Sequence, residues 1–254
     1  MVISAIRGGI GFLTRVPIGH DKKAWDAFRQ TPVAFTVIGY PLGTIVALPF
    51  VLLSIVPVPT LIGVYLLILI GVTGITHIDG IADIGDAAVV HDTDDEHSRR
   101  RSVLHDSQVG VGGALAVTVI VVSLALGVLG ATRTTPQVTF ILVLTAEVGA
   151  KSAMALLVCT GDAAHDGLGA ALIDESTPLS LFPVILALTP LLLAITYLGA
   201  SPTAAVVLTP LIVALVIKQW ADNALGGISG DVLGAVNEVS RAAAIHAGVV
   251  VWML

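Results

Sequence analysis

The sequence has few charged residues, few aromatic residues and a single cysteine. Lys, Arg, Asp and Glu make up 12% of its 254 residues, whereas about a quarter of the residues of a typical soluble domain are charged. With 56% hydrophobic residues and a mean hydropathy of +0.97, the chain falls outside the class of ordinary soluble proteins. The lone Cys159 excludes an intrachain disulfide and is interpreted as a buried thiol.

The high hydropathy indicates a membrane protein, and the shortage of aromatic residues distinguishes a helical bundle from a β-barrel. Phe, Trp and Tyr account for 5% of the chain, too few for the aromatic girdles of a transmembrane β-barrel. The apolar residues are mainly Ala, Val, Leu and Ile, which is typical of helices packed in lipid. The predicted fold class is therefore all-α, a polytopic integral membrane helical bundle with residues 1–254 as a single transmembrane domain.

About seven apolar stretches approach the roughly 20 residues that a spanning helix needs. They are 32–56, 60–77, 109–131, 137–160, 180–199, 203–219 and 242–254. Long polar loops at approximately 78–108, 161–179 and 219–241 alternate with short connections, which places the long loops on one face. The N-terminal segment lacks a charged region before its apolar stretch and a clear cleavage site, so we expect it to be retained at the membrane interface.

Basic residues predict the orientation of the bundle, because cytoplasmic loops carry an excess of Lys and Arg. Five precede the first predicted span and three lie in the first long loop: Arg7, Arg15, Lys22, Lys23, Arg29, Arg99, Arg100 and Arg101. Only Arg133 falls on the other side. The N-terminus and the long loops are therefore predicted to be cytoplasmic, at the cell membrane. A net charge of −6 argues against a nucleic-acid partner.

Three carboxylates follow one another where the second predicted span meets the cytoplasm. Asp79, Asp83 and Asp86 are spaced i, i+4 and i+7, so an α-helix stacks them on one face. Like charges in this arrangement repel and need a compensating cation. Carboxylate oxygens favour Mg²⁺, with Mn²⁺ as an alternative, and Mg²⁺ completes its shell with water and phosphate oxygens. We predict a metal site for a phosphorylated substrate; the alternative is a solvated acidic helix end.

Two further acidic clusters lie next to glycines. Asp106 is predicted as a fourth metal ligand, and the glycines from Gly110 onward either let backbone N–H groups approach a phosphate or let helices pack closely. In the last long loop, Asp231 and Glu238 are spaced i and i+7 beside Gly230. They are predicted to bind the second substrate or to accept a proton from an attacking hydroxyl, or else to cap and solvate the loop.

Glu147 and Lys151 are ionisable residues one turn apart in the apolar fourth span. Such groups usually pair or face a cavity, so they form an ion pair or Lys151 meets a phosphate near the cytoplasmic mouth. The histidines lack zinc-like spacing, and no Gly-x-Ser-x-Gly elbow or Cys/His pairing indicates covalent catalysis. The Gly39-x-x-x-Gly43 pattern is interpreted as a helix-packing motif.

Taken together, these motifs resemble those of the cobalamin 5′-phosphate synthase family, the adenosylcobinamide-GDP ribazoletransferases, over nearly the whole chain. The motifs are Phe12-Leu13-Thr14-Arg15-Val16-Pro17, Ile38-Gly39 with Gly43, His77-x-Asp79-Gly80-x-x-Asp83-x-x-Asp86, Asp106-Ser107 with Gly110, Gly167-Leu168-Gly169, and Gly226-Gly227 through Gly230-Asp231-x-x-Gly234-Ala235-x-x-Glu238. The sequence departs from the family pattern at Lys151, where an Arg is expected, and at Asp166, where a Glu is more usual. Lysine cannot form the bidentate hydrogen bonds that arginine makes with a phosphate.

The resemblance implies a step of cobalamin biosynthesis that closes the nucleotide loop. α-Ribazole or α-ribazole 5′-phosphate attacks the corrinoid-bound phosphate of adenosylcobinamide-GDP, and GMP leaves. Clustered carboxylates with Mg²⁺ suit such a transfer between phosphate-bearing substrates. The implied metal ligands are Asp79, Asp83, Asp86 and Asp106, the implied catalytic residues Asp231 and Glu238, and the implied substrate contacts Lys151, Gly110 and Gly230. The choice of acceptor and the presence of a homo-oligomer stay open.

Two other interpretations compete with this one. CDP-alcohol phosphotransferases and aromatic prenyltransferases also place paired Asp residues at helix ends, but the first family expects an Asp-Gly-x-x-Ala-Arg sequence. Here Asp79-Gly80 is followed by Ile81-Ala82-Asp83. A cation transporter could use the same carboxylates, yet transporters usually carry ionisable groups near the bilayer midplane and often contain repeated halves.

Overall fold

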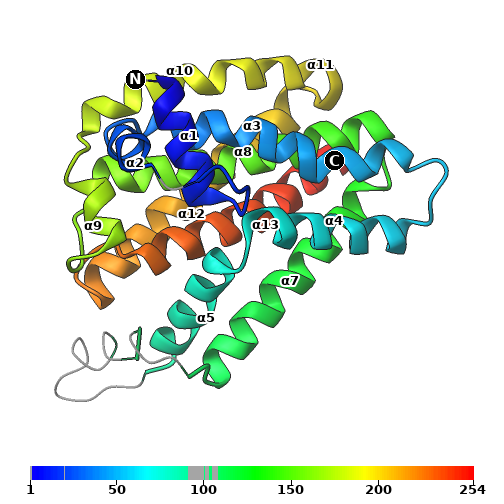
Figure 1. Cartoon of the computed structure of the whole chain (residues 1–254). Helices are drawn as coiled ribbons and strands as arrows, with labels where there is room; N and C mark the ends of the chain where they lie inside the picture. The colour runs from blue at the N-terminus through cyan, green and yellow to red at the C-terminus, as the bar shows by residue number, and fades with distance from the viewer. Residues whose placement is uncertain (1, 20, 91–99, 101–102, 105–107) are drawn as a thin grey trace.

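The computed structural model describes residues 2–19, 21–90, 100, 103–104 and 108–254 as an assembly of helices (Figure 1). The α-helices are α1 (Val2–Leu13), α2 (Lys22–Arg29), α3 (Val33–Ala47), α4 (Val58–Thr73), α5 (Thr76–Ala88), α7 (Val111–Ala131), α8 (Pro136–Thr160), α9 (Leu168–Ile173), α10 (Leu181–Leu188), α11 (Ile195–Leu198), α12 (Ala200–Ala224) and α13 (Gly230–Met253). Short 3-10 helices are η1 (Leu48–Leu52), η2 (Pro178–Ser180) and η3 (Thr189–Ala194). The described residues contain no β-strand, so the all-α prediction is confirmed.

The number of spanning helices differs from the predicted seven. Five helical segments are long and apolar enough to cross a membrane: Val33–Leu52, Val111–Ala131, Pro136–Thr160, Pro178–Leu198 and Ala200–Ala224. The count rises to six if α4 and α5 are taken as one bent span. The seventh predicted stretch, 242–254, is the second half of α13, whose first half carries the charged residues of the last cluster.

A sharp break separates α4 from α5. The helices meet at an angle of 95°, and Gly74 between them has a φ of +76°, a conformation that glycine adopts without the steric penalty of a Cβ atom. The apolar helix therefore stops at Thr73, and the Asp-bearing helix leaves in a new direction, as Figure 1 shows. The predicted continuous stretch 60–77 is therefore interrupted near its end, at Gly74.

The predicted long loops are shorter than expected because helices extend into them. The prediction of a loop over 219–241 was wrong, since α12 continues to Ala224 and α13 begins at Gly230. Likewise, α5 occupies the start of the 78–108 loop, and α9 lies within 161–179. Regular helices thus carry Asp79, Asp83 and Asp86 on α5 and Asp231 and Glu238 on α13, which fixes their spacing in three dimensions.

α8 is the central helix of the bundle. In its apolar window 83% of the residues are buried, against 17% in the segment of α10 and α11, so α8 contacts protein where the outer helices leave apolar side chains for lipid. A Cβ atom at Gly39 of α3 would lie 2.9 Å from the Val148 Cα of α8, and one at Gly43 would lie 2.9 Å from the Leu144 carbonyl oxygen. The predicted packing role of Gly39 and Gly43 is confirmed.

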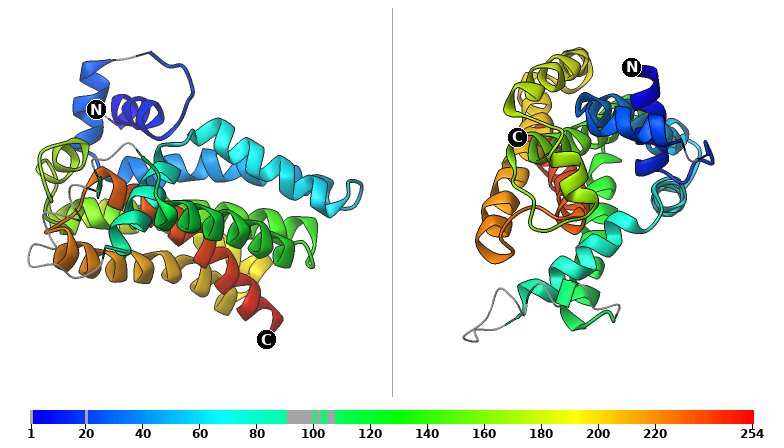
Figure 2. Two further views of the ribbon diagram at one scale, coloured as in Figure 1. Left: turned by 90° about the horizontal axis from the view of Figure 1, so that it is seen from below. Right: turned by 60° about the vertical axis from the view of Figure 1, so that its left-hand side comes forward.

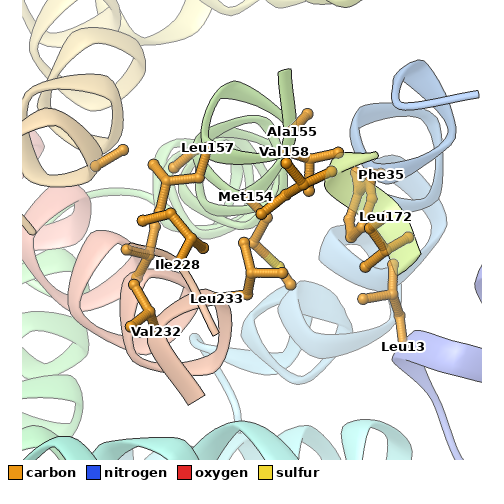
Figure 3. Close-up of a cluster of buried hydrophobic side chains, with 14 of the residues drawn as sticks. Leu13, Phe35, Met154, Ala155, Leu157, Val158, Leu172, Ile228, Val232 and Leu233 are labelled. Atoms are coloured by element: carbon orange, nitrogen blue, oxygen red, sulfur yellow. The ribbon is translucent and has the colours of Figure 1, made fainter. Parts of the chain in front are cut away.

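One end of the bundle is held by a buried apolar cluster that draws on distant parts of the chain. Figure 3 shows Leu13 of α1, Phe35 of α3, Leu172 of α9 and Leu233 of α13 around Met154 of α8. The pair α1 and α2 packs beside the main bundle (Figure 2). This cluster fixes the N-terminal segment next to the helices that carry the acidic residues.

Candidate active site at the junction of α5 and α13

Two glycines bring α5 and α13 into close contact. A Cβ atom at Gly80 would lie 2.6 Å from the carbonyl oxygen of Asp231, and one at Gly234 would lie 3.1 Å from the Cα of His77. Any larger residue at either position would push the two helices apart. The first turn of α13 therefore lies against the first turns of α5, and Asp231 joins the acidic face of α5.

The electrostatics of this junction show that its carboxylates act on one another. Partial burial, together with the charges of Asp231, Asp79 and Asp86, raises the pKa of Asp83 from 3.8 to about 6. Burial and the charge of Asp79 also raise the pKa of Asp231, against the hydrogen bond from Ser229 and the charge of His165. A cation bound among these carboxylates would offset their mutual repulsion. Asp79, Asp86 and Asp231 thus lie within electrostatic reach of Asp83, and we refer to these four carboxylates as the acidic junction.

Asp86 also ties α5 to α7. Its two carboxylate oxygens accept hydrogen bonds from the backbone N–H groups of Gly110, at 2.7 Å, and Gly113, at 2.8 Å. Negative charge is favourable at a helix N-terminus, where N–H groups lack partners within the helix. The N–H of Gly110, expected to face a substrate, is thus directed to Asp86, although the carboxylate retains lone pairs for a cation.

The predicted metal ligands that the structure describes do not form a closely grouped set of three or more. Within the described residues, no three His, Cys, Asp or Glu side chains are grouped closely enough to hold one ion, and Asp106 lies outside these residues. Mg²⁺ commonly takes only one or two carboxylates and fills its shell with water and phosphate oxygens. The donor chemistry of Asp79 and Asp83 fits that pattern.

Glu238 and Lys151 lie elsewhere, in a buried ionic network between α8 and α13. Lys151 is 0% exposed; its Nζ lies 2.8 Å from Oε1 of Glu147 and donates to Oδ1 of Asn237 at 2.7 Å. Arg241 donates through Nε to Glu147 at 2.5 Å and through Nη1 to Glu238. Two acids and two bases thus balance one another, and the predicted Glu147–Lys151 ion pair is confirmed.

Asn237 connects this network to α5 and to the acidic junction. Its Nδ2 donates to Oε1 of Glu238 at 2.9 Å and lies 3.3 Å from Nδ1 of His77, which precedes Asp79 by two residues. Neither Asn237 nor Arg241 was predicted as a functional residue from the sequence. The available signal was a run of polar residues at helical spacing within α13, which only a helix surrounded by protein can accommodate.

The loop before α9 is fixed beside the start of α13. The backbone N–H of Ile228 donates to the carbonyl oxygen of Asp162, and that of Ala164 donates to the carbonyl oxygen of Ile228. This pairing places His165 within electrostatic reach of Asp231. His165 was not predicted as a site residue, because the histidines lack zinc-like spacing. Gly230, a predicted substrate contact, faces open space, with no atom within 4 Å of a Cβ built there.

The family model described as cobalamin-5-phosphate synthase matches residues 5–249. The chain belongs to this family. Three relatives carry the name adenosylcobinamide-GDP ribazoletransferase. That of Haloquadratum walsbyi is 99% identical over 254 residues and covers 100% of both chains. That of Halorubrum lacusprofundi is 46% identical over 99% of both chains, and that of Methanocella arvoryzae is 28% identical over 99% of this chain and 98% of its own. No solved structure matches.

Membership of the cobalamin-5-phosphate synthase family confirms the resemblance seen in the motifs. It makes the chain a transferase of cobalamin biosynthesis built from apolar membrane helices. The match over residues 5–249 decides against the CDP-alcohol phosphotransferase and transporter interpretations. It also gives the junction of α5 and α13 a chemical context, since both helices carry the motifs on which the resemblance depends.

Proposed function

We propose that this protein transfers the cobinamide phosphate group of adenosylcobinamide-GDP to α-ribazole or α-ribazole 5′-phosphate. The acceptor hydroxyl oxygen forms a bond to the phosphorus attached to the corrinoid, and the bond from that phosphorus to the GMP oxygen breaks. The acceptor hydroxyl loses its proton and GMP leaves, giving adenosylcobalamin or its 5′-phosphate. The full-length match to relatives that bear the transferase name carries this proposal.

The acidic junction of α5 and α13 supports a metal-dependent mechanism. Asp79 and Asp83 would hold Mg²⁺, or Mn²⁺ as an alternative, with Asp86 and Asp106 as the further predicted ligands. Bound there, the ion would offset the negative charge of the diphosphate. Burial and the repulsion of neighbouring carboxylates raise the pKa of Asp83. The repulsion supports this assignment, because a cation would relieve it.

Asp231 is the side chain that we propose to accept the proton of the attacking hydroxyl. It lies at the start of α13, next to the Asp79 face of α5 and beside the open space at Gly230. A carboxylate with a raised pKa is a better base than an ordinary one. Glu238, paired with Arg241 in the buried network, is assigned the orienting role in place of proton transfer.

The remaining predicted substrate contacts fall into two groups. Gly230 faces open space beside Asp231, so its backbone leaves room for a substrate phosphate. Gly110 acts through Asp86, and Lys151 acts through the network that holds α13 and α5 in register. We place the junction on the cytoplasmic side of the cell membrane, following the basic residues of the N-terminal segment.

The proposal is tested by GMP release from adenosylcobinamide-GDP and α-ribazole 5′-phosphate, using the protein purified in detergent. GMP and a cobalamin product should form with Mg²⁺ and disappear with EDTA. A folded protein that forms no product with any divalent metal would overturn the proposed reaction, whereas product that persists in EDTA would overturn the metal assignment alone.

A further inference from the structure

A cavity of about 820 Å³ lies between α1, α2 and the segment that joins them. Its volume falls within the roughly 300–1,000 Å³ of pockets that enclose drug-sized ligands. That size suits a nucleotide. None of the four carboxylates of the acidic junction lines the cavity, so the cavity is separate from that junction.

The charges around the cavity favour an anion. Its basic lining residues are Arg7, Arg15 and Lys22, and its one acidic lining residue is Asp21. Arg7 is partly neutralised, because its guanidinium lies 3.6 Å from Asp21 and donates to the carbonyl oxygen of Ile18. Arg15 and Lys22 form no ion pair with any residue that the structure describes. Their positive charge remains available to a ligand.

Another part of the cavity wall is aromatic and apolar. Phe12 and Trp25 both line it, and their ring centroids lie 5.4 Å apart. Phe28 packs behind them, with centroids 5.6 and 6.0 Å away, so the rings form a fixed wall. Such rings bind planar heteroaromatic groups by stacking and by edge contacts.

Residues of the cavity wall contact the segments that lead into the two helices of the acidic junction. The Arg15 backbone N–H donates to the carbonyl oxygen of Val72, and the Arg15 Nε lies 2.9 Å from where a Cβ atom of Gly74 would sit. Gly74 is the break from which α5 leads to Asp79. On the other side, Leu168 lines the cavity and the next residue, Gly169, packs against Ser229. Figure 1 shows the segment after α1 reaching the junction of α4 and α5.

We propose that this cavity binds the acceptor substrate as a nucleoside monophosphate. The planar, apolar base lies against Phe12 and Trp25, and the phosphate monoester lies on Arg15 and Lys22, with the sugar directed toward Asp231. The inference rests on the proposed function and deepens it, because it makes Arg15 the residue that selects the phosphorylated acceptor.

The first experiment measures binding by calorimetry in detergent with EDTA present, so that no metal bridges the ligand to the acidic junction. Wild-type protein should bind α-ribazole 5′-phosphate more tightly than α-ribazole. Arg15→Gln should weaken binding of the phosphorylated ligand by about 10- to 100-fold, as expected for a lost charged hydrogen bond. Its effect on α-ribazole should stay within about twofold.

Matched variants separate this effect from a general loss of folding. Lys23→Gln removes an exposed cation of the same helix that does not line the cavity, and it should change neither affinity. Lys22→Gln alters an exposed lining side chain and should weaken only the phosphorylated ligand, so it keeps the test valid if Arg15→Gln does not fold. Equal effects of Arg15→Gln on both ligands, or no binding to wild type, would overturn the proposal.

Two competitors identify the source of the phosphate. Anionic lipid in nanodiscs would displace α-ribazole 5′-phosphate, compared with phosphatidylcholine alone, if the cavity served a lipid headgroup. GMP would compete more strongly than the acceptor if the cavity served the donor nucleotide. Either result would overturn the assignment. If the wild type turns over and Arg15→Gln has the same KM for the acceptor as the wild type, this inference is refuted and the proposed function stays intact.

Discussion

Asp79 and Asp83 present the paired oxygen donors on which the proposed metal binding depends. We expect Asp79→Asn and Asp83→Asn each to lower the rate of GMP release by about 100-fold or more, the scale of losing one group that stabilises transition-state charge. The change is isosteric and relieves repulsion, so thermal unfolding should not shift downward. Asp174→Asn, at an exposed carboxylate after α9, should retain full activity. Near-normal turnover in either variant would refute the metal assignment.

The raised pKa of Asp83 predicts how metal binding depends on pH. Protons and divalent cations compete for the same oxygens, so Mg²⁺ affinity should rise as pH increases through about 6 and level off above it. Calorimetric titration of Mg²⁺ across this range measures the effect. Asp83→Asn should flatten the profile, and an unchanged inflection in that variant would assign the titration to another group.

The same pKa shift has a consequence for stability without metal. Because the pKa of Asp83 is about 6 in the folded chain and 3.8 as its ordinary value, the folded state binds more protons between these values. The stability contributed by this group is therefore present at low pH and is lost as pH rises through the window. Melting temperatures in EDTA should fall over this range, and added Mg²⁺ should restore them above it.

At the scale of helices, the contact of α5 with α13 depends on the absence of a side chain at Gly80. Gly80→Ala would place a Cβ atom 2.6 Å from the Asp231 carbonyl oxygen, and overpacking of this kind costs about 1–3 kcal/mol. We expect a lower melting temperature and a large loss of activity, because Asp231 moves away from Asp79.

Gly71→Ala in α4 is the matched control for the Gly80 prediction. No atom lies within 4 Å of a Cβ built there, and alanine in a helix is favoured over glycine by about 0.5–1 kcal/mol. It should leave activity unchanged and stability equal or higher. Equal behaviour of the two variants would mean that the helices adjust and that the close approach does not position Asp231.

The buried network between α8 and α13 should be sensitive to the loss of one partner. Arg241→Met leaves Glu147 and Glu238 without their shared cation, and breaking a buried pair in this way costs about 3–5 kcal/mol. Unfolding in mixed detergent measures the loss. The control variant, Lys218→Met, removes the exposed ion pair with Asp222, whose atoms lie 2.6 Å apart. We expect it to lower the free energy of unfolding by only about 0–1 kcal/mol. Similar losses in the two variants would show that the buried network is not a structural unit.

At the scale of the whole molecule, the basic residues predict which face of the membrane carries the acidic junction. In a chain with Cys159→Ser, a single Asp174→Cys should react with an impermeant reagent only when the cytoplasmic side is accessible, and Arg133→Cys only from the opposite side. Both positions lie outside the five apolar spans. Labelling of both from one side would contradict the predicted topology.

Helical periodicity and apolar length are local properties, so the sequence by itself determined the all-α membrane class, the common face of Asp79, Asp83 and Asp86, and the packing role of Gly39 and Gly43. It also carried the family motifs. It placed the loop over 219–241 wrongly, because a polar helix such as α13 is stable only when other helices cover it, and local hydropathy contains no information on what covers a segment.

The tertiary structure alone decided which of the predicted site residues meet. Asp231 reaches the acidic face of α5 because Gly80 lets the backbones touch, whereas Glu238, seven residues further along the same helix, turns into the buried network with Arg241 and Lys151. The cavity beside Arg15 likewise exists only because α1 and α2 fold against the bundle. These outcomes depend on steric fit between residues far apart in the chain, which spacing along a single helix does not specify.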